Sequence, residues 1–212
     1  MGKYETIIVD RPAERVSRIT LDRADKRNAI STVMRRELLD VLERNDVDDE
    51  VRVTIIRGSG PCFSSGYDLG GDLMSEPPFH TAPGDGSWAR HVTQNWFDFW
   101  DLAKPVVAQV HGWCLAGGSE LATACDLVYV AEDAQIGYPP VRLMSPPDMQ
   151  FHPWMMGMRQ AMESMLTGDS LSGAEAARRG WANRAYPAAE LEAEVLAIAE
   201  RVAKLPTELA AI

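Results

Sequence analysis

Several features are scarce or missing in this 212-residue sequence, and each absence excludes a class of function. The 21 Lys and Arg are outnumbered by 31 Asp and Glu, so the net charge is −10 and the chain lacks the basic excess that general nucleic-acid binding requires. No apolar run approaches the roughly 18 residues of a membrane span, and the first residues lack the apolar stretch of a signal peptide. We therefore predict a cytoplasmic protein that binds neither nucleic acid nor a membrane.

Motifs that hold metals and nucleotides are also missing. The three cysteines, Cys62, Cys114 and Cys125, show no paired ligand spacing, and so sparse a set fits a reducing compartment. No Gly-x-Gly-x-x-Gly follows a predicted strand, which disfavours a dinucleotide site, and the glycine-Lys-Ser/Thr run of a P-loop does not occur. The sequence therefore predicts no metal and no bound cofactor.

The overall composition is typical of a globular protein. Hydrophobic residues make up 46% and charged residues 25%, which is typical of a chain with an apolar core, and the length suits one domain. Segments rich in β-branched residues alternate with segments of helical periodicity, which indicates an α/β fold. Strands are predicted at 6–9, 16–21, 51–57, 106–110, 126–130 and 134–137, and helices at 31–45, 88–103, 154–167 and 190–203.

The most informative segment is a glycine corner after the strand at 106–110. Ala116-Gly117-Gly118 leads into a helix whose first turn carries Glu120, and a similar corner, Ser65-Gly66-Tyr67, follows the strand at 51–57. Glycine lets the backbone approach a ligand closely, and a helix start leaves N–H groups unpaired. Two such corners could bring one N–H each to a single oxygen near a carboxylate. These are the groups needed for proton transfer beside an activated carbonyl.

Each of these features also has a purely structural interpretation. Glycines make turns, and an acid in the first turn of a helix stabilises the helix dipole. The cations Arg23, Lys26 and Arg27 form either a solvated loop or a contact with a phosphate-bearing ligand. The helix at 88–103 carries several aromatic side chains, part of them core and part able to line an apolar pocket.

Taken in order, these segments resemble the crotonase superfamily, the enoyl-CoA hydratase/isomerase family. The resemblance rests on the order and spacing of residues 23–29, 62–69, 104–112, 117–122, 125–126, 134–137, and 166–168 leading to 174–176. It implies a spiral of β-β-α turns, a homotrimer or dimer of trimers, and a coenzyme A thioester as substrate. We expect a single crotonase-like domain over 1–212, with the spiral core at 1–187. Residues 188–212 would begin a C-terminal helical region that is otherwise missing or truncated.

The resemblance also implies roles for individual residues. The backbone N–H groups of Tyr67 and Gly117 would form an oxyanion hole for the thioester oxygen, and Glu120 matches the first catalytic glutamate of the hydratases. Residues that match the family's CoA-binding segments are Arg23, Lys26, Arg27, Ser64, Ser65, Gly66, Asp68 and Leu69.

One position departs from the family pattern. Hydratases carry a second glutamate where this chain has Pro140, which cannot transfer a proton. Asp148 or His152 could serve as an auxiliary group, or Glu120 could act alone. The leading hypothesis is an acyl-CoA enzyme of the hydratase/isomerase type that stabilises a thioester enolate. The alternatives are a divergent crotonase that hydrolyses a CoA thioester or opens a ring, and a non-catalytic acyl-CoA-binding protein.

Overall fold

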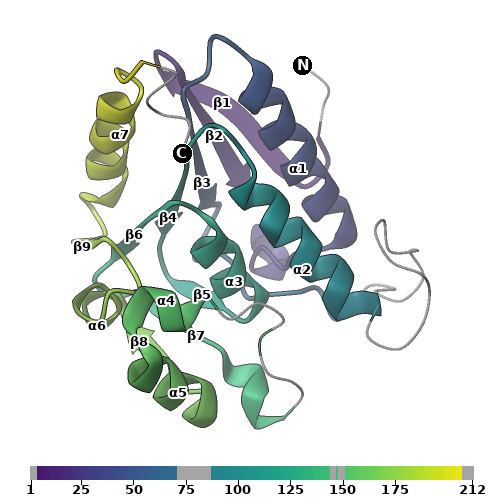
Figure 1. Cartoon of the computed structure of the whole chain (residues 1–212), viewed down its shortest axis with the longest axis vertical. Coiled ribbons are helices and arrows are strands. Elements are labelled where there is room, and N and C mark those ends of the chain that lie inside the picture. Colours follow the sequence, from purple (N-terminus) through teal and green to yellow (C-terminus); the bar gives the residue numbers. More distant parts are fainter. Residues whose placement is uncertain (1–3, 71–86, 144–146, 148–150, 207–212) are drawn as a thin grey trace.

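A six-stranded sheet forms the centre of the computed structural model, which describes residues 4–70, 87–143, 147 and 151–206 (Figure 1). The strand order is β1-β2-β3-β4-β6-β9. Strands β1 and β2 pair as an antiparallel hairpin, and the pairs from β2 to β9 are parallel. The strand bounds are β1 Ile7–Ala13, β2 Val16–Leu21, β3 Val53–Gly58, β4 Val106–Val110, β6 Leu127–Ala131 and β9 Arg184–Tyr186.

A second, three-stranded sheet adjoins the first. It contains β5 (Trp113–Leu115), β7 (Gln135–Gly137) and β8 (Leu171–Ser172), in that order. Strand β5 runs parallel to β7, and β7 runs antiparallel to β8. After β4 and again after β6, the chain passes from a strand of the large sheet to a strand of the small one and then into a helix. This is the spiral of β-β-α turns that the resemblance implies.

Helices cover both sides of the large sheet. Helices α1 and α2 run side by side along one side, and α7 lies on the other (Figure 1). Because the central strands are covered on both faces, β4 is buried along its whole length, as expected for a parallel strand with apolar side chains on both faces. The helix bounds are α1 Thr32–Val47, α2 Ser87–Trp100, α3 Gly117–Ala124, α4 His152–Met156, α5 Met158–Thr167, α6 Gly173–Arg178 and α7 Leu191–Val202, with 3-10 turns η1 Ala24–Lys26 and η2 Pro139–Arg142.

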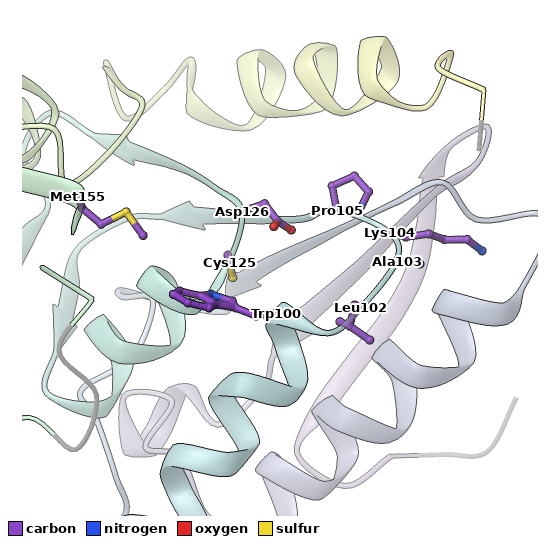
Figure 2. A pocket seen from close by; sticks show the side chains of 8 residues that line it. All are labelled: Trp100, Leu102, Ala103, Lys104, Pro105, Cys125, Asp126 and Met155. Carbon is purple, nitrogen blue, oxygen red and sulfur yellow. The ribbon is translucent and has the colours of Figure 1, made fainter. Parts of the chain in front are cut away.

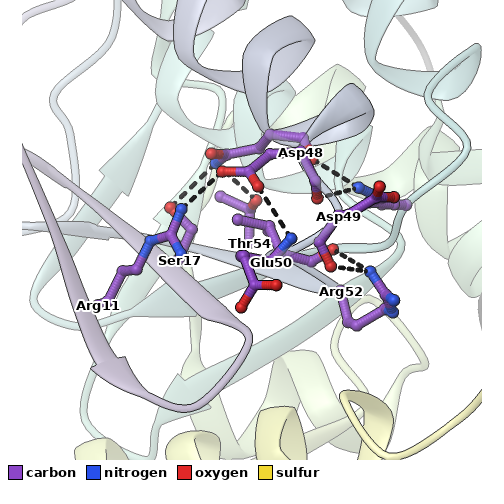
Figure 3. Close-up of polar contacts among 10 residues, drawn as sticks. Arg11, Ser17, Asp48, Asp49, Glu50, Arg52 and Thr54 are labelled. Carbon is purple, nitrogen blue, oxygen red and sulfur yellow. Dashed lines mark hydrogen bonds and ion pairs between the residues drawn. The ribbon is translucent and has the colours of Figure 1, made fainter. Parts of the chain in front are cut away.

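Polar contacts fix the C-terminal end of α1 against the first strands. Asp48 accepts a hydrogen bond from Arg11 of β1 at 2.6 Å (Figure 3). In the last turn of α1, the buried Asn45 donates to Ser17 of β2 and to Thr54 of β3, each at 3.0 Å. These bonds orient α1, and with it the loop that precedes the helix.

The local expectations are confirmed for most elements, and one of them is wrong. Ser31 caps α1 by accepting from the Met34 N–H at 3.2 Å, as its position before the helix predicts. The single helix predicted at 154–167 is instead two helices, α4 and α5, which meet at Gly157. Gly157 has φ +80° and ψ 155°, an extended conformation with positive φ that favours glycine and interrupts a helix, and a hydrophobic pattern cannot reveal it. Within the described residues, no helix combines the length and the apolarity needed to cross a lipid bilayer.

Candidate active site

The two glycine corners of the sequence lie against each other. The Leu115 N–H donates to the Ser64 carbonyl at 3.0 Å, which joins the end of β5 to the segment after β3. A Cβ placed on Gly66 would lie 2.7 Å from the Ala116 Cβ and 3.2 Å from the Gly117 nitrogen. Only a glycine at 66 permits this approach. The apposition that the sequence suggested is therefore present in the fold.

Backbone conformation at the second corner is unusual. Ala116, which precedes α3, has φ 51° and ψ −127°, a region that residues with a side chain rarely occupy. Its N–H donates to the Gly137 carbonyl of β7 at 2.9 Å, which helps to hold the strained residue in place. Such strain is found more often at functional sites than elsewhere. Gly117 is the first residue of α3, so its N–H has no acceptor within the helix.

A buried carboxylate follows this corner by one turn of helix. The Glu120 side chain has no exposure to solvent, and the Tyr67 hydroxyl donates a short hydrogen bond to its Oε2. The indole N–H of Trp96, a residue of α2 that is 1% exposed, donates to the Tyr67 hydroxyl oxygen at 3.1 Å. A connected set of polar groups therefore runs from α2 through Tyr67 to α3.

The tyrosine ring also touches the second glycine corner. A Cβ on Gly117 would come within 2.7 Å of two ring atoms of Tyr67 and 2.8 Å of a third. The ring is half-buried and lies directly over the Gly117 Cα. The sequence pointed to Tyr67 for its backbone amide alone. The sequence feature that could have indicated the contacts of the ring and the hydroxyl is a large side chain directly after the corner glycine.

The basic loop before α1 is attached to the first corner. Arg23 pairs with Asp68 at 2.8 Å and donates to the Ala29 carbonyl at 2.6 Å, so its charge is already matched by an acid. Hydrogen bonding by Arg23 lowers the pKa of the Asp68 carboxyl below its usual range. Lys26 and Arg27 are exposed. Of the three cations proposed to contact a phosphate, these two face solvent.

Asn28 joins that loop to the corner, and the sequence analysis did not single it out. Its side chain is fully buried and donates to the carbonyls of Ser59 at 2.9 Å and Cys62 at 2.8 Å. The backbone carbonyl of Asn28 accepts from the Ser64 hydroxyl at 2.8 Å. Asn28 has φ 52°, a left-handed conformation in which asparagine is enriched, but that preference is too weak a signal to recognise from sequence.

The other predicted CoA-binding residues surround the first corner. Ser64 is buried, and its hydroxyl accepts from the Gly66 N–H at 3.1 Å. The Ser65 N–H donates to the Arg27 carbonyl at 3.0 Å. Leu69 is 65% exposed, which leaves an apolar side chain at the edge of the site.

Of the two proposed auxiliary residues, Asp148 and His152, the structure describes only His152. Pro140 lies in η2, and Asp148 is outside the described residues. His152 begins α4, is 3% exposed, and lines a small cavity with Ser164 and Trp181. Burial lowers the pKa of His152 to about 4, and its Nδ1 has no hydrogen-bond partner among the described residues. The lining of that cavity does not include Glu120 or Tyr67.

A larger hollow of about 320 Å³ lies at the C-terminal end of α2 (Figure 2). It is lined by Trp100, Leu102, Ala103, Lys104, Pro105, Cys125, Asp126 and Met155. The Asp126 carboxylate accepts from the Val106 N–H at 2.7 Å, and burial raises the pKa of Asp126. Because that bond ties Asp126 to the start of β4, we interpret the acid as a structural one. In the part of the chain that the structure describes, no group of three His, Cys, Asp or Glu side chains is arranged to hold a metal.

Comparison with known proteins identifies the family. A model of the enoyl-CoA hydratase/isomerase family matches residues 11–212. A putative enoyl-CoA hydratase, EchA13 of Mycobacterium tuberculosis, is 35% identical over 97% of this chain and 69% of its own length. Hydroxycinnamoyl-CoA hydratase-lyase of Pseudomonas fluorescens is 30% identical over 95% of this chain and 74% of its own.

Solved structures agree with the sequence matches. An enoyl-CoA hydratase/isomerase from Xanthobacter autotrophicus Py2 superposes with a TM-score of 0.88 at 32% identity, covering 98% of this chain and 77% of that one. The chain therefore belongs to the enoyl-CoA hydratase/isomerase family, a family of acyl-CoA-processing enzymes in the crotonase superfamily.

Proposed function

We propose that this protein binds an acyl-CoA thioester, stabilises its enolate through the N–H groups of Tyr67 and Gly117, and moves a proton with Glu120. The observation that carries the proposal is the buried Glu120 carboxylate, one helical turn after a corner that is packed against a second glycine corner. A single oxyanion-hole donor typically contributes about 3 kcal/mol of transition-state stabilisation.

The proposed proton transfer needs no other reactant. Glu120 removes a proton from a carbon activated by the thioester, and the electron pair moves to the carbonyl oxygen, where two N–H groups stabilise it. When the carbonyl re-forms, Glu120 returns the proton to another carbon of the acyl chain. Together these two proton transfers shift a double bond without an electron acceptor, so we propose that no cofactor takes part.

Pro140 favours this proton shift over water addition. Addition of water by two carboxylates requires a second acid, and a proline side chain carries no proton to give. Thioester hydrolysis or ring opening remains the second candidate, because one base can activate a water molecule for either reaction.

Two exposed cations are candidates for contact with the phosphates of the coenzyme. We propose that Lys26 and Arg27 contact the CoA phosphates, because both are exposed beside the first corner, whereas Arg23 is paired with Asp68. Ser64, Ser65, Gly66, Asp68 and Leu69 would then lie along the CoA chain. We also propose the homotrimer, or dimer of trimers, that the resemblance implies.

The test is Glu120→Gln, assayed on a panel of CoA esters by mass spectrometry. Water addition, double-bond shift and thioester cleavage give products that differ in mass or retention time. We expect a loss of turnover of about 1,000-fold or more with CoA-ester binding retained, since the amide keeps the shape but loses the base. Glu132→Gln, an exposed acid on a turn after β6, is the matched control and should retain activity. Full activity of Glu120→Gln would remove the proposed role, and tight binding without turnover of any ester by the unmodified protein would favour a binding protein.

A further inference from the structure

We infer that the Tyr67 side chain is a positioning group for Glu120, in addition to the role proposed for its backbone N–H. This inference rests on the proposed function, because Glu120 is the base in that proposal. It concerns a contact that residue type alone does not imply: Tyr67 and Glu120 are 53 positions apart, and a half-buried phenol reaches a fully buried carboxylate.

Hydrogen-bond chemistry fixes the direction of this contact. The Trp96 indole N–H can only donate, so the Tyr67 oxygen accepts from it at 3.1 Å. A phenol has one hydrogen, and the Tyr67 hydroxyl donates it to the Glu120 Oε2, because a carboxylate oxygen accepts. Trp96 therefore orients the phenol so that its hydrogen points at the carboxylate.

Burial of the neighbouring groups strengthens the hydrogen bond between Tyr67 and Glu120. Glu120 has no solvent exposure and Trp96 is 1% exposed, so water does not compete for either group. A donor held toward a carboxylate favours its charged form, and the charged form is the one that takes a proton. The bond also limits rotation of the carboxylate, because Oε2 stays with Tyr67.

Buried groups from α1 and α2 lie next to this contact. Helix α2 presents the neutral Trp96 to Tyr67, and its neighbour Asn95 accepts from Arg35 of α1 at 3.2 Å. Both Asn95 and Arg35 are buried. At the start of α3, the Gly117 backbone lies against the ring. The phenol places a polar hydrogen directly on the carboxylate.

Ring and hydroxyl act on different parts of the site. The ring lies on the Gly117 Cα, at the proposed oxyanion corner, and the hydroxyl reaches Glu120. One side chain therefore sets the spacing between the group that polarises the thioester and the group that moves the proton. Productive geometry of this kind tolerates displacements of less than about 1 Å.

The experiment is Tyr67→Phe, which removes the hydroxyl and keeps both the ring and the backbone N–H. With the best CoA ester from the panel, we expect kcat to fall about 10-fold or more, with KM changed far less. The acidic limb of the pH–rate profile should move to higher pH by about 1 unit, because the carboxylate has lost a donor that favours its charged form. Tyr4→Phe is the matched control. It removes a phenol hydrogen bond to Asp40 of 2.6 Å on another face and should leave both readouts unchanged.

A second measurement does not depend on turnover. The side-chain carboxyl carbon of Glu120, labelled with ¹³C and assigned by its loss in Glu120→Gln, is titrated by NMR. The pH at the midpoint of this titration should rise in Tyr67→Phe. It should rise by a smaller amount in Trp96→Phe, where the phenol is present but no longer oriented. An unchanged midpoint and an unchanged acidic limb in folded Tyr67→Phe would overturn the inference. Full activity of Glu120→Gln would instead overturn the proposed function, so the two failures are distinguishable.

Discussion

Replacing Gly117 by alanine tests the packing of the Tyr67 ring on the second glycine corner. The added Cβ would lie 2.7 to 2.8 Å from three ring atoms of Tyr67, closer than the 3.0 Å that real Cβ contacts respect. Those three atoms are the nearest neighbours that the new methyl group would meet, so the strain comes from one side chain. The ring would have to move by roughly 0.5 to 1 Å to reach an ordinary contact.

Two free-energy terms set the expected result. Overpacking of a filled site typically costs about 1–3 kcal/mol, whereas alanine in place of glycine in a helix gains at most about 1 kcal/mol. Gly117 does not have a positive φ, so the backbone itself accepts alanine. We therefore expect Gly117→Ala to destabilise the wild-type protein by about 0–2 kcal/mol. In a Tyr67→Ala background, where the obstructing ring is gone, the same change should be neutral or stabilising.

The assay is urea denaturation of the four proteins of a double-mutant cycle. The free energies of unfolding should give a coupling of about 1–3 kcal/mol between positions 117 and 67. Equal effects of Gly117→Ala in both backgrounds, within about 0.5 kcal/mol, would show that the ring does not lie on the corner and would refute the reasoning. The measurement needs no substrate, so it tests the geometry of the site apart from its chemistry.

Two further perturbations test other parts of the site. Asn28→Ala should lower the free energy of unfolding by about 2–4 kcal/mol in urea, because it leaves the buried Cys62 carbonyl and the part-buried Ser59 carbonyl without their side-chain donor. A change under about 0.5 kcal/mol would contradict this. His152 has a pKa of about 4 in the folded protein and an ordinary value of 6.5, so the unfolded state takes up the proton first. Stability should fall by up to about 3 kcal/mol as pH drops from 6.5 to 4, and denaturation at stepped pH should show a shallower decline in His152→Asn.

Local features of the site could be recognised from sequence because they depend on residues close together in the chain. The mostly apolar segment Val106–Val110 predicts a buried strand, Ser31 predicts a helix start, and the glycines before Glu120 predict a corner leading into a helix. Each signal comes from contacts within about four residues, where side-chain type and backbone preference act directly. The order and spacing of such segments are also sufficient to identify the family, since a fold is maintained through the same ordered set of local elements.

Tertiary structure decided which side chains meet. Three hydrogen bonds of the site join segments that lie on different elements: Tyr67 to Glu120, Trp96 to Tyr67, and Asn28 to Cys62. They meet because β3 and β4 are neighbours in the sheet and α2 packs on α3, and pairwise residue preferences are too weak to predict such meetings from sequence. The break at Gly157 was likewise not predictable, because glycine is compatible both with a helix and with the positive-φ conformation that it adopts here, and the residue type alone does not select one of them.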